Sequence, residues 1–410
     1  MKAKRILIAL SLLVSSPVAL AAGADDEHHF PQGATFSTLI TTPLPIEGMT
    51  GDNRGNLYTP ARAIAAGQPC PVWRVNIENP SLVVVGFIPA PSATGMCLPL
   101  GLAFDRGGRL FVTETDKIYS FIPNATTPPV ANLFVSGVPG TNGVAFDEDG
   151  NLWTSDGTTG QGRVWKIGPS GGVCESSFVG CEEVFRVQPM ANEVNLVKDA
   201  SGNLIGGVGR DVRTLPPGTI RVTPTTRNAE NTAGSQPLVA NGLAFDKDGD
   251  LFVSDTARAA LWKVNFDRRG NLRSRTGCDT TFTANTLCLE NLFVAHPLLE
   301  GADGIALDRD GNIWVDANER NAIVVVTDER KVIEVFRNAP VAGLRNTGPL
   351  EFNTSPVLSD RKLCTANLDA GRRDNFPNSA GEANPAGPNR GKISCMDQRL
   401  PVRGVTLPVR

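Results

Sequence analysis

The sequence lacks the signals of several common protein classes. It contains no Gly-Lys-Ser or Gly-Lys-Thr phosphate loop, which argues against a P-loop nucleotidase. It contains no Cys-x-x-Cys pair, which argues against thiol redox catalysis. Its lysines and arginines form no basic stripe, and the net charge of -3 is small. We therefore expect neither nucleic acid nor a membrane surface as a partner, which leaves a small molecule.

Long apolar runs are scarce, and the first one is typical of an export signal. A basic start precedes the apolar residues 6–13, and the Ala-Leu-Ala of residues 19–21 forms a cleavage site. This run is too short for a membrane-spanning helix, and no later segment is long and apolar enough. We expect a signal peptide at residues 1–21, a mobile leader at 22–33 and one domain at 34–410. The protein is predicted to be periplasmic or secreted.

The cysteine content supports export to an oxidising compartment. The chain has eight cysteines, an even number, which favours disulfides over metal thiolates in an exported protein. They fall in close pairs along the chain, and the pairing of neighbours is the simplest connectivity. The predicted bonds are Cys70–Cys97, Cys174–Cys181, Cys278–Cys288 and Cys364–Cys395.

A short pattern recurs along the chain and predicts the fold. In each copy an apolar strand ends at an acidic residue, a turn containing glycine follows, and a second apolar strand begins, as in a β-hairpin. Two more strand-like runs follow most copies. Units of four strands at a spacing of about 40 to 60 residues are typical of β-propeller blades, whereas solenoid repeats are shorter. The clear copies are residues 101–112, 143–153, 242–253 and 304–315, and the weaker ones are 48–58 and 195–205.

The number of blades follows from the turn glycines. These are Gly55, Gly108, Gly150, Gly202, Gly249 and Gly311. Residues 353–363 fit the same pattern without its glycine, and residues 34–40 form a spare strand that can complete the last blade and close the ring. The literal count predicts an all-β propeller with seven blades. Six blades with a decorated tail is the alternative.

One position of the repeat carries polar residues in most copies. It lies eight residues before the turn glycine, at the start of the first strand. First strands line the central channel of a propeller, so their starts gather at one mouth of that channel. The residues at this position are Glu47, Leu100, Asn142, Val194, Asn241 and Asp303, with Asn353 in the partial unit.

This ring of carboxylates and amides predicts a bound cation. Carboxylates that face one another in a buried site repel and lose solvation, and a cation resolves both problems. Glu, Asp and Asn supply hard oxygen ligands suited to Ca²⁺ or Mg²⁺. No His or Cys lies in the ring, which argues against Zn²⁺. The alternative is that Asn and Asp before Gly only form turns.

The segments around these residues resemble a known family. Residues 47–48 (Glu-Gly), 241–244 (Asn-Gly-Leu-Ala) and 303–306 (Asp-Gly-Ile-Ala) are similar to metal-binding strands of the regucalcin/gluconolactonase-like (senescence marker protein) propellers. That family is related to paraoxonases and NHL-repeat proteins. The resemblance covers most of residues 40–370, and it implies Ca²⁺- or Zn²⁺-dependent hydrolysis of lactones and similar esters.

The resemblance also implies individual roles. Glu47, Asn241 and Asp303 would be metal ligands, and Asn142 a further ligand or a substrate contact. Asp303 would take a proton from water. His296 would be another candidate general base, as a histidine is thought to be in paraoxonases, with a capping role as the alternative.

Two observations leave a second function open. Residues 139–143 lack the Arg-x-Asn-Asp of sugar-lactone members, which argues against binding of a sugar acid. The acids after the second strands, Glu114, Asp156, Asp255 and Asp316, are expected to tie the following turns and not to form a second site. The leading hypothesis is a metal-dependent lactone or ester hydrolase. The alternative is a binding or scaffolding propeller with a structural metal.

Overall fold

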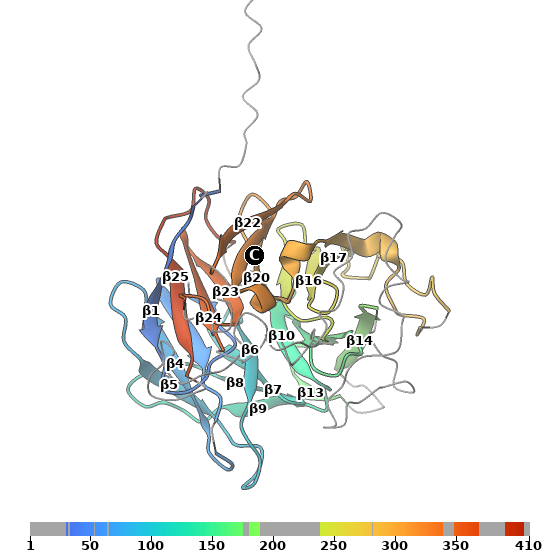
Figure 1. The fold of residues 1–410 in the computed structure, drawn as a ribbon. Coiled ribbons are helices and arrows are strands. Elements are labelled where there is room, and N and C mark those ends of the chain that lie inside the picture. Colours follow the sequence, from blue (N-terminus) through green and yellow to red (C-terminus); the bar gives the residue numbers. More distant parts are fainter. Residues whose placement is uncertain are drawn as a thin grey trace, which may run out of the picture.

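The structure is a computed structural model of the chain, and it describes residues 30–31, 33–52, 54–63, 65–174, 180–188, 238–280, 282–338, 348–368 and 390–405. Within those ranges the protein forms six sheets and no α-helix. The sheets surround a central channel, and in Figure 1 the colours run round the ring in chain order. The prediction of an all-β propeller is confirmed. Among these residues, no helix is long and apolar enough to cross a membrane.

Each sheet is one blade, and we number the blades by their innermost strands in chain order. Blade one contains β2 (Thr50–Gly51), β3 (Asn56–Pro60), β4 (Cys70–Asn76) and β5 (Val83–Ile88). Blade two contains β6 (Pro99–Phe104), β7 (Leu110–Glu114), β8 (Lys117–Phe121) and β9 (Asn132–Ser136), and β13 (Gly172–Val173) pairs with β9. Blade three contains β10 (Thr141–Phe146), β11 (Leu152–Asp156), β12 (Arg163–Ile167) and β14 (Cys181–Arg186).

The remaining blades follow the same plan, and the last is a composite. Blade four contains β15 (Leu243–Phe245), β16 (Leu251–Asp255), β17 (Ala260–Val264) and β18 (Leu292–Ala295). Blade five contains β19 (Ala302–Leu307), β20 (Ile313–Ala317), β21 (Ala322–Val326) and β22 (Val332–Arg337). Blade six contains β23 (Asn353–Ser359), β24 (Lys362–Asn367), β25 (Lys392–Met396) and β1 (Phe36–Thr41). Three 3-10 helices are η1 (Leu289–Asn291), η2 (Pro297–Leu299) and η3 (Asn318–Arg320).

The hairpin between the first two strands is held by its acidic residue. In blade five, Asp308 accepts hydrogen bonds from the backbone N–H of Asp310 and Asn312 and from the indole of Trp314, at 3.0 Å each. Gly311 adopts a φ of 88°, a left-handed conformation that favours glycine. The same arrangement recurs at Asp147 in blade three. The repeated Asp and Gly therefore build one turn in successive blades.

The N-terminal strand closes the ring, as predicted. β1 pairs antiparallel with β25, so the outermost strand of blade six comes from the other end of the chain. The two strands lie side by side in blue and red in Figure 1. Phe30, inside the predicted leader, packs edge-on against Trp314 at a centroid distance of 5.7 Å. The predicted signal peptide lies outside the described residues.

The prediction of seven blades is wrong, and the alternative of six is correct for the described residues. The extra unit was counted from residues 195–205. These residues and Val194 lie outside the part of the chain that the structure describes. The first strands of blades three and four are direct neighbours, because a Cβ on Gly143 would collide with the backbone carbonyl of Asn241. No strand fits between them at this level. A hairpin-like pattern in the sequence does not require a separate blade.

Glycines allow the inner strands to approach closely at five of the six junctions between blades. Gly48, Gly101, Gly143, Gly242 and Gly304 each face the carbonyl oxygen of the next blade's polar ring position. A Cβ on Gly242 would lie 2.5 Å from the Asp303 carbonyl oxygen and 2.9 Å from the Gly304 Cα, closer than real side chains approach. Glycine is therefore needed here for space and not for an unusual φ.

We expect Gly242→Ala to destabilise the fold by about 1–3 kcal/mol, because the added methyl group meets backbone atoms that cannot rotate away. Denaturant unfolding measures this change. Gly168→Ala is the matched control, since a Cβ there meets its nearest neighbour at 3.8 Å. Equal losses in the two variants would contradict the close approach of the inner strands.

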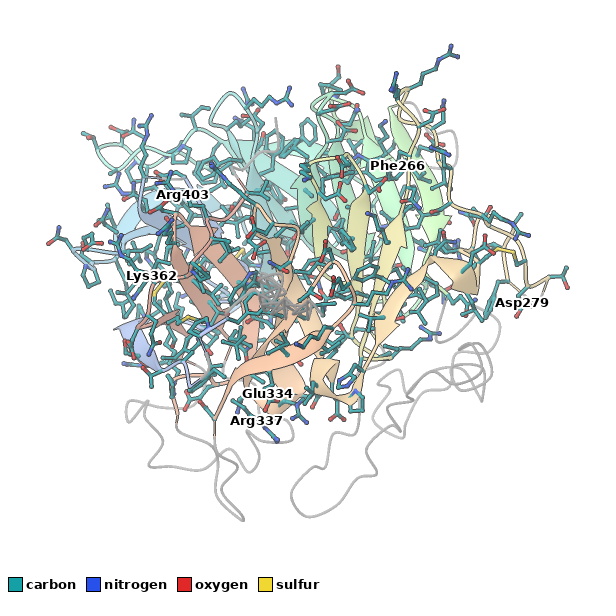
Figure 2. The ribbon with its side chains drawn as sticks, turned by 90° about the horizontal axis from the view of Figure 1, so that it is seen from above. Phe266, Asp279, Glu334, Arg337, Lys362 and Arg403 are labelled. Carbon is teal, nitrogen blue, oxygen red and sulfur yellow. A yellow bond between two sulfur atoms is a disulfide. The ribbon has the colours of Figure 1, made fainter. Side chains whose placement is uncertain are left out.

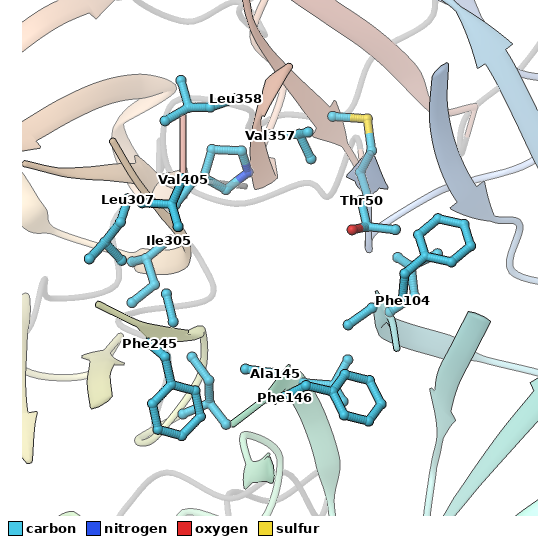
Figure 3. A pocket seen from close by; sticks show the side chains of 18 residues that line it. Thr50, Phe104, Ala145, Phe146, Phe245, Ile305, Leu307, Val357, Leu358 and Val405 are labelled. Atoms are coloured by element: carbon cyan, nitrogen blue, oxygen red, sulfur yellow. The ribbon is translucent and has the colours of Figure 1, made fainter. Parts of the chain in front are cut away.

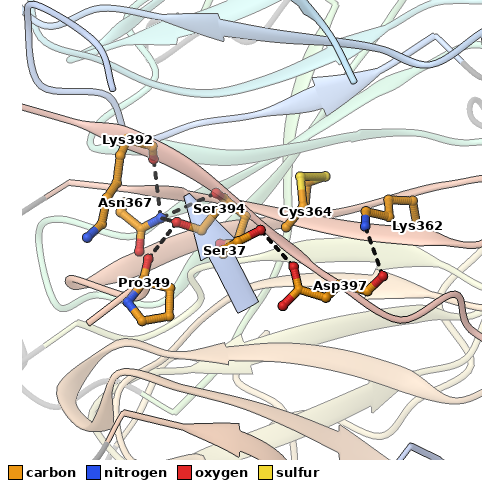
Figure 4. The surroundings of a disulfide bond; sticks show 10 residues. Ser37, Pro349, Lys362, Cys364, Asn367, Lys392, Ser394 and Asp397 are labelled. Atoms are coloured by element: carbon orange, nitrogen blue, oxygen red, sulfur yellow. Dashed lines mark hydrogen bonds between the residues drawn. A yellow bond between two sulfur atoms is a disulfide. The ribbon is translucent and has the colours of Figure 1, made fainter. Parts of the chain in front are cut away.

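The four predicted disulfides are present. They join Cys70 to Cys97, Cys174 to Cys181, Cys278 to Cys288 and Cys364 to Cys395. The last bond connects the neighbouring strands β24 and β25 inside the closing blade, where Cys364 and Cys395 are directly paired. Figure 4 shows it among the hydrogen bonds of Asn367 and Ser394. These bonds are compatible with a protein of an oxidising compartment.

Candidate functional site

The predicted ring residues occupy equivalent places on successive inner strands. The carbonyl oxygens of Leu100, Asn142, Asn241 and Asp303 each face the ring glycine of the preceding blade. The circle closes because the Thr354 hydroxyl donates to the Glu47 carbonyl oxygen at 2.6 Å. Glu47, Asn142, Asn241 and Asp303 therefore lie at one level of the channel. Asn142, Asn241 and Asp303 are buried, at 7%, 2% and 6% exposed.

Blade six differs from the prediction at this level. The residue equivalent to Asp303 is Thr354, because Gly304 faces the Thr354 carbonyl oxygen just as Gly242 faces that of Asp303. Asn353 lies one position earlier in the strand and is turned toward blade five. There its side-chain amide donates to Asp316 at 2.8 Å and to the Ala322 carbonyl at 2.9 Å. The sequence pattern misses this shift because the turn after β23 is shorter than in the other blades.

Serine hydroxyls fix the backbone of the ring. The Ser254 hydroxyl accepts from the Gly242 N–H at 2.6 Å and donates to the Asp303 carbonyl oxygen at 2.5 Å. Ser155 makes the same link between Gly143 and Asn241, at 2.8 and 2.5 Å. Each hydroxyl thus joins the ring peptides of neighbouring blades. The ring side chains consequently project from a backbone that is held on both sides.

Asp303 is the most strongly perturbed carboxyl group of the ring. Burial raises its pKa well above the usual range, and the nearby charges of Glu47 and Asp316 raise it further. Asn318 donates to its Oδ2 at 2.8 Å, and Asn241 also hydrogen-bonds to it, which together favour the carboxylate. Glu47 and Asp303 start the inner strands of blades one and five, so both face the same mouth of the channel.

Glu47 faces the single guanidinium of Arg62. Burial raises the Glu47 pKa, and the charge of Arg62 partly offsets this rise. The Nη1 of Arg62 lies 3.4 Å from Glu47 Oε2, and the Glu47 side chain is 13% exposed. Arg62 was not predicted from the sequence, because its place opposite Glu47 depends on the packing of β3 beside β2.

The two amides of the ring differ in their surroundings. The Asn241 amide donates to the Thr256 hydroxyl at 3.0 Å, which turns its oxygen away from that partner. The Asn142 side chain packs over Gly157, where a Cβ would lie 2.5 Å from Asn142 Nδ2. Both residues present a polar group near the channel mouth. The Asn241 side chain also hydrogen-bonds to the carboxylate of Asp303.

His296 lies outside the ring and caps a 3-10 helix. Its Nδ1 accepts the backbone N–H of Leu298 at 3.2 Å, at the start of η2. Burial and the charge of Arg320 lower the pKa of the imidazole. In the described part of the chain, no hydrogen bond joins His296 to Asp303 or Glu47. This geometry supports the capping role. The role of His296 as a general base stays a prediction.

Three of the four acids after the second strands make local contacts, as predicted, including Glu114, which accepts from the Thr115 hydroxyl at 2.9 Å. Asp255 accepts from the backbone N–H and the guanidinium of Arg258, at 3.1 and 2.9 Å. Asp156 accepts from the N–H and hydroxyl of Thr159 at 3.1 and 2.5 Å.

Asp316 is different, because it is one residue out of register with these acids. It occupies the place of the linking hydroxyls of Thr113, Ser155 and Ser254. It is fully buried and accepts from Thr365 Oγ1 at 2.5 Å and from Asn353. Burial raises its pKa to about 7 even though these two hydrogen bonds act to lower it. The sequence indicates this difference, because blade five has Asp at a position where blades two, three and four have Thr or Ser.

The ring fits a hard cation by its chemistry. No group of three or more His, Cys, Asp or Glu side chains in the described ranges is arranged to hold a metal ion. The ring instead combines two carboxylates with the amides of Asn142 and Asn241, so all of its ligating atoms would be oxygens. The unrelieved repulsion between Glu47 and Asp303 is the condition that a divalent cation would remove.

The other end of the channel is apolar. The same inner strands continue into a cavity of about 110 Å³ whose lining is almost wholly hydrophobic, with Phe104, Phe146 and Phe245 among its walls (Figure 3). Val405 reaches this end from the last described segment, where its N–H donates to the Leu307 carbonyl at 3.0 Å. The polar chemistry of the channel is thus confined to the mouth that carries the ring.

The family comparison agrees with this geometry. Residues 190–343 match the model of the SMP-30/Gluconolactonase/LRE-like region. The matched residues include Asn241 and Asp303, which the resemblance had singled out. A search of curated proteins finds no match.

Solved structures of other proteins share the fold of this chain. A luciferin-regenerating enzyme is 14% identical, with 91% of this chain and 97% of that chain covered and a TM-score of 0.51. The calcium-binding protein regucalcin from Agrobacterium tumefaciens is 15% identical, with 90% and 94% covered and a TM-score of 0.52. A PQQ-bound aldose sugar dehydrogenase from Streptomyces coelicolor is 13% identical, with 90% and 100% covered and a TM-score of 0.50. Since such different proteins share the fold, function has to be argued from the site.

Proposed function

We propose that this protein is an exported, metal-dependent hydrolase of lactone or ester substrates. The observation that carries the proposal is that Glu47, Asn241 and Asp303 lie at one level of the channel mouth, with Asn241 and Asp303 buried and Glu47 only 13% exposed. The charge of Glu47 adds to the rise of the Asp303 pKa that burial causes. The SMP-30/gluconolactonase-like region supports a reaction of the lactonase type. The disulfides support a periplasmic or secreted location.

The residues that would hold the cation are Glu47, Asn241 and Asp303, with Asn142 as a further ligand or a substrate contact. Their oxygen atoms favour Ca²⁺, with Mg²⁺ next, and the absence of His and Cys from the set makes Zn²⁺ the least suited. A divalent cation bound here polarises a carbonyl group and stabilises the oxyanion that develops during hydrolysis.

The protein's own groups supply the proton transfer and the orientation. Asp303, as a carboxylate, accepts a proton from the attacking water, while Asn318 holds its Oδ2 in place. The serine links beneath the ring keep Asn241 and Asp303 in fixed positions, which reduces the cost of organising the site during the reaction. Burial keeps bulk water away from these carboxyl groups.

A second candidate function is a binding or scaffolding propeller with a structural metal. The observation in its favour is the capping contact of His296, which leaves the ring without a hydrogen-bonded histidine in the described residues. In that case the cation would only neutralise Glu47 and Asp303 and so stabilise the fold.

A lactone panel distinguishes these functions. We expect purified protein to hydrolyse at least one lactone or aryl ester in the presence of Ca²⁺, and to lose this turnover with a chelator. Thermal unfolding with and without Ca²⁺ is the parallel measurement, because a bound ion raises the melting temperature by mass action. A Ca²⁺-dependent melting temperature without any turnover would favour the scaffolding function. Turnover that resists the chelator would contradict metal dependence.

A further inference from the structure

Arg62 is a guanidinium group at the edge of the acidic ring with few partners of its own. Within the described part of the chain, the Arg62 side chain makes one ion pair, in which its Nη1 lies 3.4 Å from Glu47 Oε2. The side chain is 24% exposed, whereas Glu47 is 13% exposed. A guanidinium carries five N–H donors, so most of those of Arg62 remain available to a ligand.

The backbone around Arg62 is held firmly on both sides. The Arg62 N–H donates to the Pro45 carbonyl oxygen at 2.8 Å, and Ile46 and Ala61 form a β-bridge beside it. On the other side, the Ala63 N–H donates to the Cys97 carbonyl oxygen at 2.9 Å, next to the Cys70–Cys97 disulfide. The backbone of Arg62 is thus fixed next to Glu47, so the guanidinium can reach a bound anion without a large backbone rearrangement.

Among the residues that the structure describes, the acidic groups at this mouth outnumber the basic groups that face them, so the positive charge of Arg62 stands out. Asp303 and Asp316 are buried, and Glu47 is partly buried. Burial raises the Asp303 pKa, and the charges of Glu47 and Asp316 raise it further. Arg62 is the basic group that acts on Glu47. By comparison, Arg186 is fully engaged, because it donates to both carboxylate oxygens of Glu183. Arg62 makes one longer contact to a single oxygen and so keeps its fork geometry open for a second anion.

We propose that Arg62 is a specificity-determining residue that binds a carboxylate held at the ring, and that it selects ligands with an anionic oxygen pair. The inference rests on the proposed function, since opening a lactone or ester produces a carboxylate at the site. Arginine binds carboxylates through two parallel N–H donors, which a lysine cannot reproduce. Arg62 contacts Glu47, one of the residues proposed to bind the metal ion. A carboxylate bound beside those residues therefore comes within reach of the Arg62 guanidinium.

Calorimetric titration of full-length protein in Ca²⁺ tests this inference without turnover. The probes are 4-hydroxybutyrate, the ring-opened form of γ-butyrolactone, and the neutral 1,4-butanediol. We expect wild-type protein to bind the carboxylate, and Arg62→Gln to weaken this binding at least about tenfold, the range of a lost charged hydrogen bond. Arg62→Lys should recover only part of the affinity. Binding of the diol should not change.

Two controls separate this role from simple neutralisation of Glu47. Arg403→Gln removes an exposed arginine that is paired with Asp360. Figure 2 shows Arg403 toward one end of the propeller, and Glu334 and Arg337 toward the other. It should leave carboxylate binding unchanged. Calorimetry with Ca²⁺ alone and thermal unfolding show whether Arg62→Gln alters the cation site or the fold.

The outcomes are decisive in each direction. Undiminished carboxylate binding in Arg62→Gln, equal loss for acid and diol, or no binding by the wild-type protein would overturn the inference. Lactone turnover is measured separately on the same samples. Turnover with unchanged carboxylate binding in the variant refutes the role of Arg62 and leaves the hydrolase standing. Binding that depends on Arg62 without any turnover supports Arg62 and refutes the hydrolase.

Discussion

Asp303→Asn is expected to lower Ca²⁺-dependent turnover at least about 100-fold, the lower end of what a positioned proton acceptor contributes. The amide cannot accept a proton and supplies less charge to a bound cation. The fold without metal should be as stable as wild type or more so, because the variant removes a buried charge that repels Glu47. Steady-state kinetics and thermal unfolding with and without Ca²⁺ measure both effects.

Asp328→Asn is the control for this experiment, since Asp328 is an exposed acid in the turn after β21. It should change neither turnover nor the response to Ca²⁺. If Asp303→Asn loses activity and stability to the same degree, the cation has a structural role and the scaffolding function is favoured. If activity persists, the proton acceptor lies elsewhere.

Asp316→Asn is expected to change the pH dependence of folding strongly. Burial raises the folded-state pKa of Asp316 from 3.8 to about 7, so the folded protein holds a proton that the unfolded chain has already released. This group therefore contributes stability at low pH that is lost as pH rises toward 7. The full loss is about 4 kcal/mol, reached near pH 8.

Denaturant unfolding of wild type and Asp316→Asn between pH 4 and pH 8 measures the effect. We expect the wild type to lose stability relative to the variant across this window and to level off above it. The substituted side chain keeps an amide oxygen toward Asn353, and the Thr365 hydroxyl can rotate to accept from the new amide N–H.

Thr365→Val is the opposing variant, because it removes a hydrogen bond that lowers the Asp316 pKa. It should shift the transition to higher pH. Parallel curves for wild type and Asp316→Asn would show that Asp316 is ionised in the folded protein at all of these pH values.

The carboxylate and amide ring connects the two predictions. Glu47, Asp303 and Asp316 derive from blades one and five, and their pKa values are shifted because the propeller buries them together. Asp303 lies at the level of the ring, where the proposed function assigns it the proton transfer. Asp316 lies between blades five and six, where it accepts hydrogen bonds from Thr365 and Asn353. One acid is therefore suited to chemistry and the other to holding two blades together.

Local sequence determined much of the architecture. The alternation of apolar residues, the acidic turn and its glycine define each hairpin through contacts within a few residues, as at Asp308 and Gly311. Repetition at one register then indicated that Glu47, Asn142, Asn241 and Asp303 start inner strands. The cysteine pairs and the closing strand β1 were also predictable, because short loops limit the partners of a cysteine and an open sheet edge requires one more strand.

Tertiary packing decided the rest. The ring closes at six blades because Gly143 and Asn241 touch directly, a contact between residues far apart in the chain. The register of blade six, with Thr354 at the ring and Asn353 beside Asp316, depends on the shorter turn and on the neighbouring blade. The pairing of Arg62 with Glu47 and the raised pKa of Asp316 arise only when separate strands are buried together. Sequence patterns report local geometry, whereas charge, desolvation and closure depend on which distant groups share the same space.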